Sequence, residues 1–264
     1  FGIDDELVKL NMYASNIEYE IRENRRNVAV ADRFVNFNTG DNINATVYQL
    51  QDPTDTANTT GYFAANTRLT GGYAQTFEID VDFPTKTAVN ASYYTDTNTI
   101  SASLFGVHGV NETESDTTWD ATDAPNFQVY AVRDELESDN VRFVLTGTAG
   151  GFVPSLESDL YEDTYQDTHW NLAVRIKPDK YPLSYQVAGA DTGAYTVELH
   201  GVQVDAGVVR NEFTISGDAR AGAAPPAGFA TGSKRVYIGS HRTNFTGTLL
   251  QQTDVKINSA RYWF

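Results

Sequence analysis

RVYIGSHRTNFTGTLLQQTDVKINSARYWF, residues 235–264, is the stretch that decides the fold of this chain. It opens with an alternating segment at 236–238, which breaks at Gly239 and leads into a polar turn. After the motif FTG at 245–247, a second alternating segment continues to residue 264. Alternation of apolar and polar side chains between glycine-containing turns is typical of antiparallel strands. The sequence therefore predicts two strands of a β-sheet protein in this stretch.

The same alternation recurs along the chain after residue 27. In 170–176, for example, Trp170 and Leu172 share one face of a strand, while Asn171 and Arg175 share the other. Many short strands separated by polar turns favour one antiparallel β-sandwich, with Trp170 and Trp263 expected in its core. The candidate strands are 28–35, 46–50, 75–83, 100–107, 127–132, 141–145, 170–176, 195–204, 211–215, 235–238 and 255–264.

The first 27 residues have a different period. Their apolar side chains are spaced by four and three residues, which predicts an amphipathic helix with an a/d seam. Two interpretations fit: a short helical neck that joins several copies of the chain, or one helix packed on its own β domain. We therefore expect a helix at 1–27 and a β-sandwich at 28–264. The seam consists of Ile3, Leu7, Leu10, Ala14, Ile17 and Ile21.

Composition and charge exclude several classes of partner. The 264 residues include 35 acidic and 19 basic side chains, for a net charge of −16. Such a surface repels phosphate backbones and anionic membranes, so we expect no nucleic-acid partner. No apolar run approaches the ~20 residues of a membrane-spanning helix, so we expect no membrane insertion. The sequence has no cysteine, which excludes disulfides, zinc–thiolate sites and thiol catalysis.

Four segments carry motifs that occur in the same order in one family of jelly-roll domains. TFEIDVDF (76–83) resembles an F-T-I-E-x-x-V strand, and WNLAV (170–174) resembles a W-H-x-V-A-V strand. YTVELHGVQVD (195–205) resembles L-Y-V-N-G-x-x-V, and 235–264 resembles the closing I-G, F-x-G and D-V-x-I elements. The chain therefore resembles concanavalin A-like lectin and laminin-G-like domains, which also occur in phage tail and virion proteins.

This resemblance implies an all-β fold: a concanavalin A-like antiparallel β-sandwich, or jelly roll, here preceded by one N-terminal α-helix. Such domains mostly bind glycans or proteins, and only some of them catalyse reactions. They often bind calcium through loop oxygens, so calcium is the cofactor that the resemblance favours. An acidic, solvated loop without a metal is the alternative. The candidate calcium ligands share one loop and are Glu112, Glu114, Asp116, Asp120 and Asp123.

Candidate glycan-binding residues combine aromatic platforms with polar loop tips. Trp119 lies in the same acidic loop, and Tyr93 and Tyr94 lie in a polar stretch. Aromatic side chains at sheet margins also commonly cover the core, which is the alternative for these three. The polar turn between the last two strands offers His241, Arg242 and Asn244 as a binding rim, or as a solvated turn without a ligand.

One segment resembles a catalytic signature. EIDVD, residues 78–82, is similar to the E-I-D-x-E strand of jelly-roll β-glucanases, in which two glutamates act as nucleophile and acid/base. Here Asp82 stands where the second glutamate belongs, and its side chain is one methylene shorter. The alternative is an ordinary strand whose carboxylates face water. Because the four histidines show no metal-ligand spacing either, we expect a protein that is not an enzyme.

We therefore expect a non-enzymatic structural or receptor- or glycan-binding module of a larger surface assembly of a virus or phage. Its partners would be other copies of the chain, joined through the heptad seam, and a cell-surface glycan. It would be extracellular or exposed on a virion. The alternatives are a free, calcium-assisted extracellular lectin and, less favoured, a glycan hydrolase that uses Glu78 and Asp82.

Overall fold

The computed structural model describes nine segments of the chain. They are residues 33–49, 74–85, 100–109, 126–136, 138–147, 152–178, 195–219, 234–243 and 245–263. All belong to one compact unit, Arg33–Phe264. The predicted helix at 1–27, its seam and most of the strand candidate at 28–35 lie outside the described residues. The described part contains no helix long and apolar enough to span a membrane.

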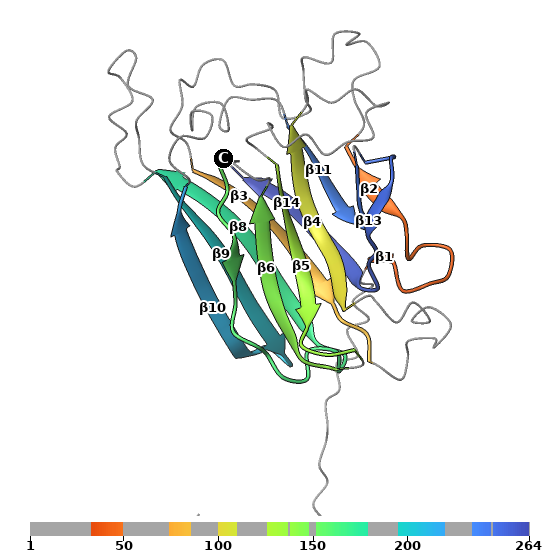
Figure 1. Ribbon diagram of the computed structural model, residues 1–264. Helices are drawn as coiled ribbons and strands as arrows, with labels where there is room; N and C mark the ends of the chain where they lie inside the picture. Colours follow the sequence, from red (N-terminus) through yellow and green to blue (C-terminus); the bar gives the residue numbers. More distant parts are fainter. Residues whose placement is uncertain are drawn as a thin grey trace, which may run out of the picture. The chain divides into compact units, whose positions relative to one another are not determined.

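Two six-stranded antiparallel sheets form the described part, together with a two-stranded ribbon of β12 (His241–Arg242) and β13 (Leu249–Gln251) (Figure 1). Sheet A runs in the order β1 (Val35–Asn36), β14 (Lys256–Trp263), β3 (Gln75–Asp82), β8 (His169–Pro178), β9 (Tyr195–Asp205) and β10 (Val208–Asp218). Sheet B runs in the order β2 (Thr46–Tyr48), β11 (Lys234–Gly239), β4 (Ser101–Gly109), β5 (Phe127–Arg133), β6 (Val141–Gly147) and β7 (Leu156–Glu157).

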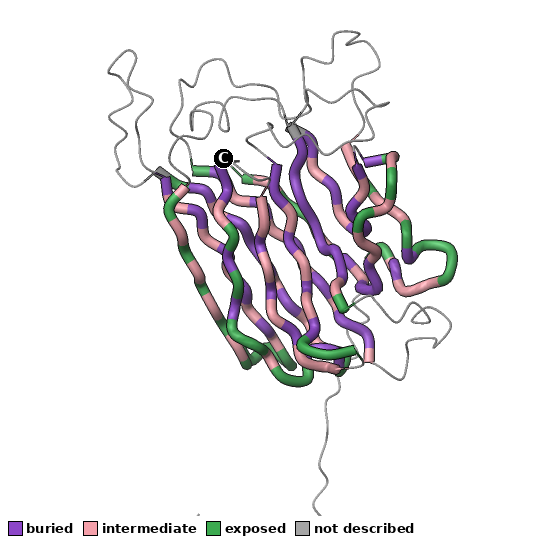
Figure 2. Tube along the Cα trace, viewed as in Figure 1, coloured by how far each residue is buried: buried purple, intermediate pink, exposed green. Residues whose placement is uncertain are grey.

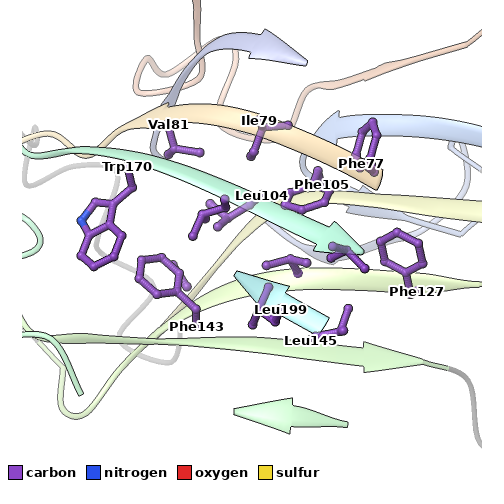
Figure 3. Close-up of a cluster of buried hydrophobic side chains, with 14 of the residues drawn as sticks. Phe77, Ile79, Val81, Leu104, Phe105, Phe127, Phe143, Leu145, Trp170 and Leu199 are labelled. Carbon is purple, nitrogen blue, oxygen red and sulfur yellow. The ribbon is translucent and has the colours of Figure 1, made fainter. Parts of the chain in front are cut away.

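The core lies between the two sheets and consists of the inward side chains of each strand (Figures 2 and 3). On β3 burial alternates along the strand, so that Phe77, Ile79 and Val81 are almost fully buried. Trp170 of β8 is completely buried, with its ring 4.8 Å from the ring of Phe143 on β6. Burying one such side chain contributes roughly 1.5–3 kcal/mol, so this alternation is what holds the two sheets together.

The two strands expected in residues 235–264 are both interior strands. β14 lies between β1 and β3 in sheet A, and β11 lies between β2 and β4 in sheet B. The sandwich predicted from alternation is therefore confirmed, and most of the predicted strands agree with the observed ones to within a few residues.

The structure differs from the prediction at its margins. β7, β12 and β13 are two or three residues long, too short to show a period, and were not predicted. β10 was expected only at 211–215 but extends over Val208–Asp218. Its ends carry polar or exposed residues on both faces, so hydrophobic alternation does not mark them.

Candidate functional site

The outer surface of sheet A presents the polar side chains of the candidate catalytic strand. Because Phe77, Ile79 and Val81 point into the core, the alternation of β3 directs Glu78 and Asp80 to the opposite side. Asp82 follows in the same row, and β3 ends there. The expectation that these carboxylates face away from the core is confirmed. All three remain partly accessible to solvent.

The neighbouring strand β8 supplies polar partners to these carboxylates. The pairing places Asp82 opposite His169 and Asp80 opposite Asn171. His169 Nδ1 lies 2.6 Å from Asp82 Oδ1, and the Asn171 side-chain amide donates to Asp80 Oδ1 at 2.9 Å. The other ring nitrogen of His169, Nε2, lies 3.9 Å from the same Asp80 oxygen. Two carboxylates are therefore held by one imidazole and one amide.

On its other side, β3 is paired with β14, which contributes an arginine. Arg261 lies opposite Glu78, and its guanidinium donates to Glu78 Oε1 at 2.7 Å. A second guanidinium nitrogen lies 3.5 Å from Asp80 Oδ2. The hydrogen bond with Glu78 and then the charge of Asp80 raise the pKa of Arg261. Asp80 is thus the centre of the network, because it contacts both neighbouring strands.

Further polar contacts lie on the same surface towards β10. Lys177 Nζ lies 2.5 Å from Glu198 Oε1, and Arg175 lies 4.0 Å from the other oxygen of that carboxylate. His200 Nδ1 lies 2.8 Å from the Thr214 hydroxyl, and partial burial, then the charge of Arg175, lowers the pKa of His200. We call this outer surface the polar face. It consists of Glu78, Asp80, Asp82, His169, Asn171, Arg175, Lys177, Glu198, His200, Arg261 and Trp263.

Trp263 was expected in the core and is instead on this surface. It pairs with Thr76, two residues beyond the Arg261–Glu78 pair, so alternation directs its ring to the same side as Arg261. The residue is 54% exposed. An exposed tryptophan on a surface that also carries charged side chains is suited to stacking on a flat ligand surface. Sequence reasoning missed this residue because hydrophobicity was weighed without the register of β14.

Glu78 and Asp82 are held by different neighbours of β3. Glu78 is bonded to β14 and Asp82 to β8, so their carboxylates are held towards opposite sides of the strand. The arrangement presents fixed hydrogen-bond donors and acceptors on the outer surface of sheet A.

A second group of polar residues lies on the outer side of sheet B, and most of its members are buried. His241 Nδ1 lies 2.7 Å from the Tyr130 hydroxyl, and the His241 ring stacks on Tyr237 at 5.4 Å. The His108 ring lies 5.6 Å from the His241 ring and 4.6 Å from the Phe245 ring. We call the four polar residues His108, Tyr130, Tyr237 and His241 the histidine cluster, and Phe245 packs against it.

Burial sets the protonation of the histidine cluster. Burial, and secondly the charge of Arg235, lower the pKa of His108 from 6.5 to about 3. Burial, and secondly His108, lower the pKa of His241 to about 3 as well. Both rings are therefore neutral near pH 7. Burial also raises the pKa of Tyr130 and of Tyr237, so neither phenol ionises in the physiological range.

The predicted binding rim is accordingly corrected at His241. This side chain is 3% exposed, because the turn after β12 folds Phe245 back over sheet B. Phe245 adopts a positive φ of 63°, and its ring stacks on Tyr48 at 5.3 Å. Arg242 donates to the carbonyl oxygens of Asn44 at 3.0 Å and Gly247 at 2.9 Å. In this structure Arg242 holds the turn in place, whereas Asn244 lies outside the described residues.

The remaining predicted site residues also lie outside the described residues. These are the aromatic candidates Trp119, Tyr93 and Tyr94, and the calcium candidates Glu112, Glu114, Asp116, Asp120 and Asp123. Among the residues that are described, no group of three or more His, Asp or Glu side chains is arranged to hold a metal ion. The calcium site remains a prediction.

Comparison with known proteins gives structural likenesses alone. No family model matches the sequence, and no curated protein matches it. The LG1-3 region of the laminin alpha2 chain is similar over 82% of this chain and 30% of that one, with a TM-score of 0.43 and 8% identity. Tailspike protein 2 from the Escherichia coli bacteriophage CAB120 is similar over 75% of this chain and 20% of that one, with a TM-score of 0.36 and 12% identity.

A third likeness is to a mutant of the alginate lyase Aly36B in complex with alginate tetrasaccharide. It covers 73% of this chain and 72% of that one, with a TM-score of 0.26 and 11% identity. This chain thus spans well under half of the laminin and tailspike chains. These likenesses concern the fold and assign no role to any residue.

Proposed function

We propose that this chain is a non-enzymatic recognition module of a larger surface assembly, and that it binds a glycan on the polar face of sheet A. The observation that carries the proposal is the network centred on Asp80. Asp80 contacts Asn171 on β8 and Arg261 on β14, so three strands fix its position. Fixed donors and acceptors on a rigid sheet lose little conformational entropy when a polar ligand binds.

The chemistry of this surface suits a neutral or mixed-charge sugar. Carboxylates accept hydrogen bonds from sugar hydroxyls, and the Arg261 guanidinium and Asn171 amide donate to them. The exposed ring of Trp263 can cover the apolar face of a sugar ring at the end of the same strand. The three β3 carboxylates are held by partners, which favours a role as fixed acceptors over acid/base catalysis.

The assembly part of the proposal rests on the sequence. The motif resemblance extends to modules of phage tail and virion proteins, and the heptad seam of residues 1–27 predicts self-association into a homo-oligomer. A virion or other extracellular surface is the location that agrees with both. Several copies in one assembly would also strengthen weak glycan binding through avidity.

The test is glycan-array binding of the full chain, with two polar-face variants and one matched control. Asn171→Ala and Arg261→Ala each remove a donor beside Asp80. Arg142→Ala breaks an exposed ion pair with Glu157 (2.5 Å) on the outer side of sheet B, away from the polar face. We expect the polar-face variants to lose binding about tenfold or more, and the control to bind like the parent.

Two outcomes would contradict this proposal. Binding that survives both polar-face variants but is lost in Trp119→Ala would move the ligand to the predicted acidic loop. Release of shorter sugars from the bound glycan, abolished by Asp82→Ala, would make the chain a hydrolase. Repeating the array with calcium and with a chelator tests the predicted cofactor at the same time.

A further inference from the structure

The outer edge of β10 is unusual among the edges of this sandwich. The other three edge strands, β1, β2 and β7, are two or three residues long. β10 is eleven residues long, from Val208 to Asp218, and is the last strand of sheet A (Figure 1). Proteins commonly shorten or cover edge strands because exposed backbone groups pair with other chains. Among the described strands, the edge strands β1, β2 and β7 are short, as this rule predicts, whereas β10 is long.

The strand is rigidly held on its inner side, so its edge is a stable template. Phe213 stacks on Phe143 at 5.6 Å and on Tyr161 at 5.4 Å, which anchors the middle of β10 to the core. From Asn211 to Asp218 the pairing with β9 is continuous, and its one register shift lies before this run, at Arg210. Among the described residues, no strand pairs with the second side of this eight-residue regular segment.

The direction of the free backbone groups follows from one hydrogen bond. The Ala219 N–H donates to the Tyr195 carbonyl at 2.8 Å, one position beyond the last pair of the β9–β10 ladder. Residues in an antiparallel ladder alternate between bonding to the partner and pointing away from it. The odd-numbered residues of this run therefore bond to β9. Glu212, Thr214, Ser216 and Asp218 direct their N–H and C=O groups to the open edge.

We propose that this edge pairs with the same edge of a second copy, antiparallel and centred on Thr214. That register places Thr214 opposite itself, Glu212 opposite Ser216, and Arg210 opposite Asp218. Threonine pairs and opposite charges across strands are both favourable, and no two carboxylates face each other. The two A sheets then form one continuous sheet across a two-fold axis, in which each surface patch meets its own copy.

Charge disfavours the register centred on Ile215. Centring the pair on Ile215 would place Glu212 opposite Asp218, with like charges across the strands, which is destabilising. Centring on Thr214 brings Arg210, the bulged residue just before the regular segment, next to Asp218 at each end of the pair. Arg210 now pairs with Asp205 at 3.0 Å, but both side chains are more than half exposed. Such a pair contributes little, so Arg210 is available to Asp218 of the second copy.

The dimer goes beyond the proposed glycan binding, because it uses the edge of sheet A and not its polar face. It also differs from self-association through residues 1–27. A single strand pair is a small interface, so we expect a weak dimer that grows with protein concentration. Each copy carries a net charge of −16, so measurements belong at about 0.15 M salt, where the screening length is about 8 Å.

The decisive variant is Thr214→Pro in the full chain, with Thr214→Val as its matched control. Proline removes the N–H that points to the open edge and leaves the hydrogen bonds to β9 in place, which is where edge strands tolerate it. Valine keeps that N–H. We expect the concentration-dependent rise in molar mass, measured by light scattering, to disappear in Thr214→Pro and to persist in Thr214→Val. Residues 1–27 are present in both, so they do not account for the difference.

A charge exchange tests the register and does not depend on proline. Asp218→Arg should weaken the dimer, and adding Arg210→Asp to the same chain should restore it, because the charges then oppose again. Hydrogen exchange at high concentration should protect the amides of Glu212, Thr214 and Ser216 in the parent. A molar mass that does not rise with concentration, or a rise that Thr214→Pro leaves unchanged, would overturn the proposal. Failure of the charge exchange to restore association would overturn this register.

Discussion

The two outer faces of the sandwich use histidine in opposite ways. On sheet A, His169 is partly exposed and lies 2.6 Å from Asp82, within a network open to solvent. On sheet B, His108 and His241 are 0% and 3% exposed, beneath the turn that carries Phe245. Both outer surfaces carry histidines, but only those of sheet A are accessible to a ligand. The histidines of sheet B are part of a second, small core, so burial and not residue type distinguishes the two surfaces.

The same contrast applies to the aromatic residues of each face. Phe245 is 2% exposed and covers the histidine cluster, whereas Trp263 is 54% exposed at the margin of the polar face. Both residues lie in the stretch 235–264. Phe245 lies in the turn after β12, and Trp263 is the last residue of β14. Only the turn of sheet B returns to the sheet, because Arg242 holds it to the carbonyls of Asn44 and Gly247.

The largest expected effect comes from truncating one aromatic side chain on each face. Phe245→Ala removes the cover of the histidine cluster, and we expect a loss of about 3–5 kcal/mol in the free energy of unfolding. Trp263→Ala should change it by only about 0.5 kcal/mol, because more than half of this residue is already exposed to solvent. Urea unfolding of both variants measures the difference. Equal losses would show that the two faces are not distinct in packing.

The next effect is a pH dependence specific to the histidine cluster. The pKa of His108 is about 3 in the folded chain, against 6.5 for an unperturbed histidine side chain, so folding favours the neutral ring. Its contribution is therefore complete above about pH 6.5 and is lost as pH falls towards 3. At pH 5 the loss is about 2 kcal/mol relative to pH 8, from the linkage between pKa and stability.

His108→Phe isolates this contribution. The stability difference between parent and variant, measured by urea unfolding at several pH values, should favour the parent less at pH 5 than at pH 8. A second buried group also titrates in this range: burial raises the pKa of Asp254 to about 7, and a backbone hydrogen bond opposes the shift. That carboxyl has the opposite slope, losing stability as pH rises from about 4 to 7, and it cancels in the comparison.

The smallest expected effect is on the polar face. Arg261 and Glu78 form an exposed ion pair at 2.7 Å, and such pairs contribute little to stability. Arg261→Ala, Glu78→Ala and the double variant should show a coupling close to experimental error, which decreases further as salt is raised. A large coupling would mean that the polar face is a structural element of the sandwich, and it would weaken the proposal that this network serves recognition.

Much of the fold was predictable because alternation is a local property. The burial of Phe77, Ile79 and Val81 and the outward position of Glu78 and Asp80 follow from period two alone. β7, β12 and β13 were not predictable, because strands of two or three residues show no period. The sandwich followed from the pattern of its long strands.

The site was less predictable because it depends on register between distant strands. Glu78 and Asp80 were identified, but their partners Arg261, His169 and Asn171 were not. Arg261 is 183 residues away from Glu78 in sequence and faces it only through the pairing of β14 with β3. His241 was expected at a rim for the same reason: its burial depends on Phe245 returning to a sheet whose position the sequence does not state.

The interior position of β11 and β14 has a consequence for how the chain folds. β1 joins sheet A only through β14, and β2 joins sheet B only through β11. β1 and β2 can therefore pair only with strands that are synthesised about two hundred residues later. Neither sheet is complete until residues 234–263 have been synthesised. Such long-range closure is typical of slow folding. A ribosome-bound chain that stops before residue 234 holds two unfinished sheets with open edges, and those edges are its point of vulnerability to aggregation.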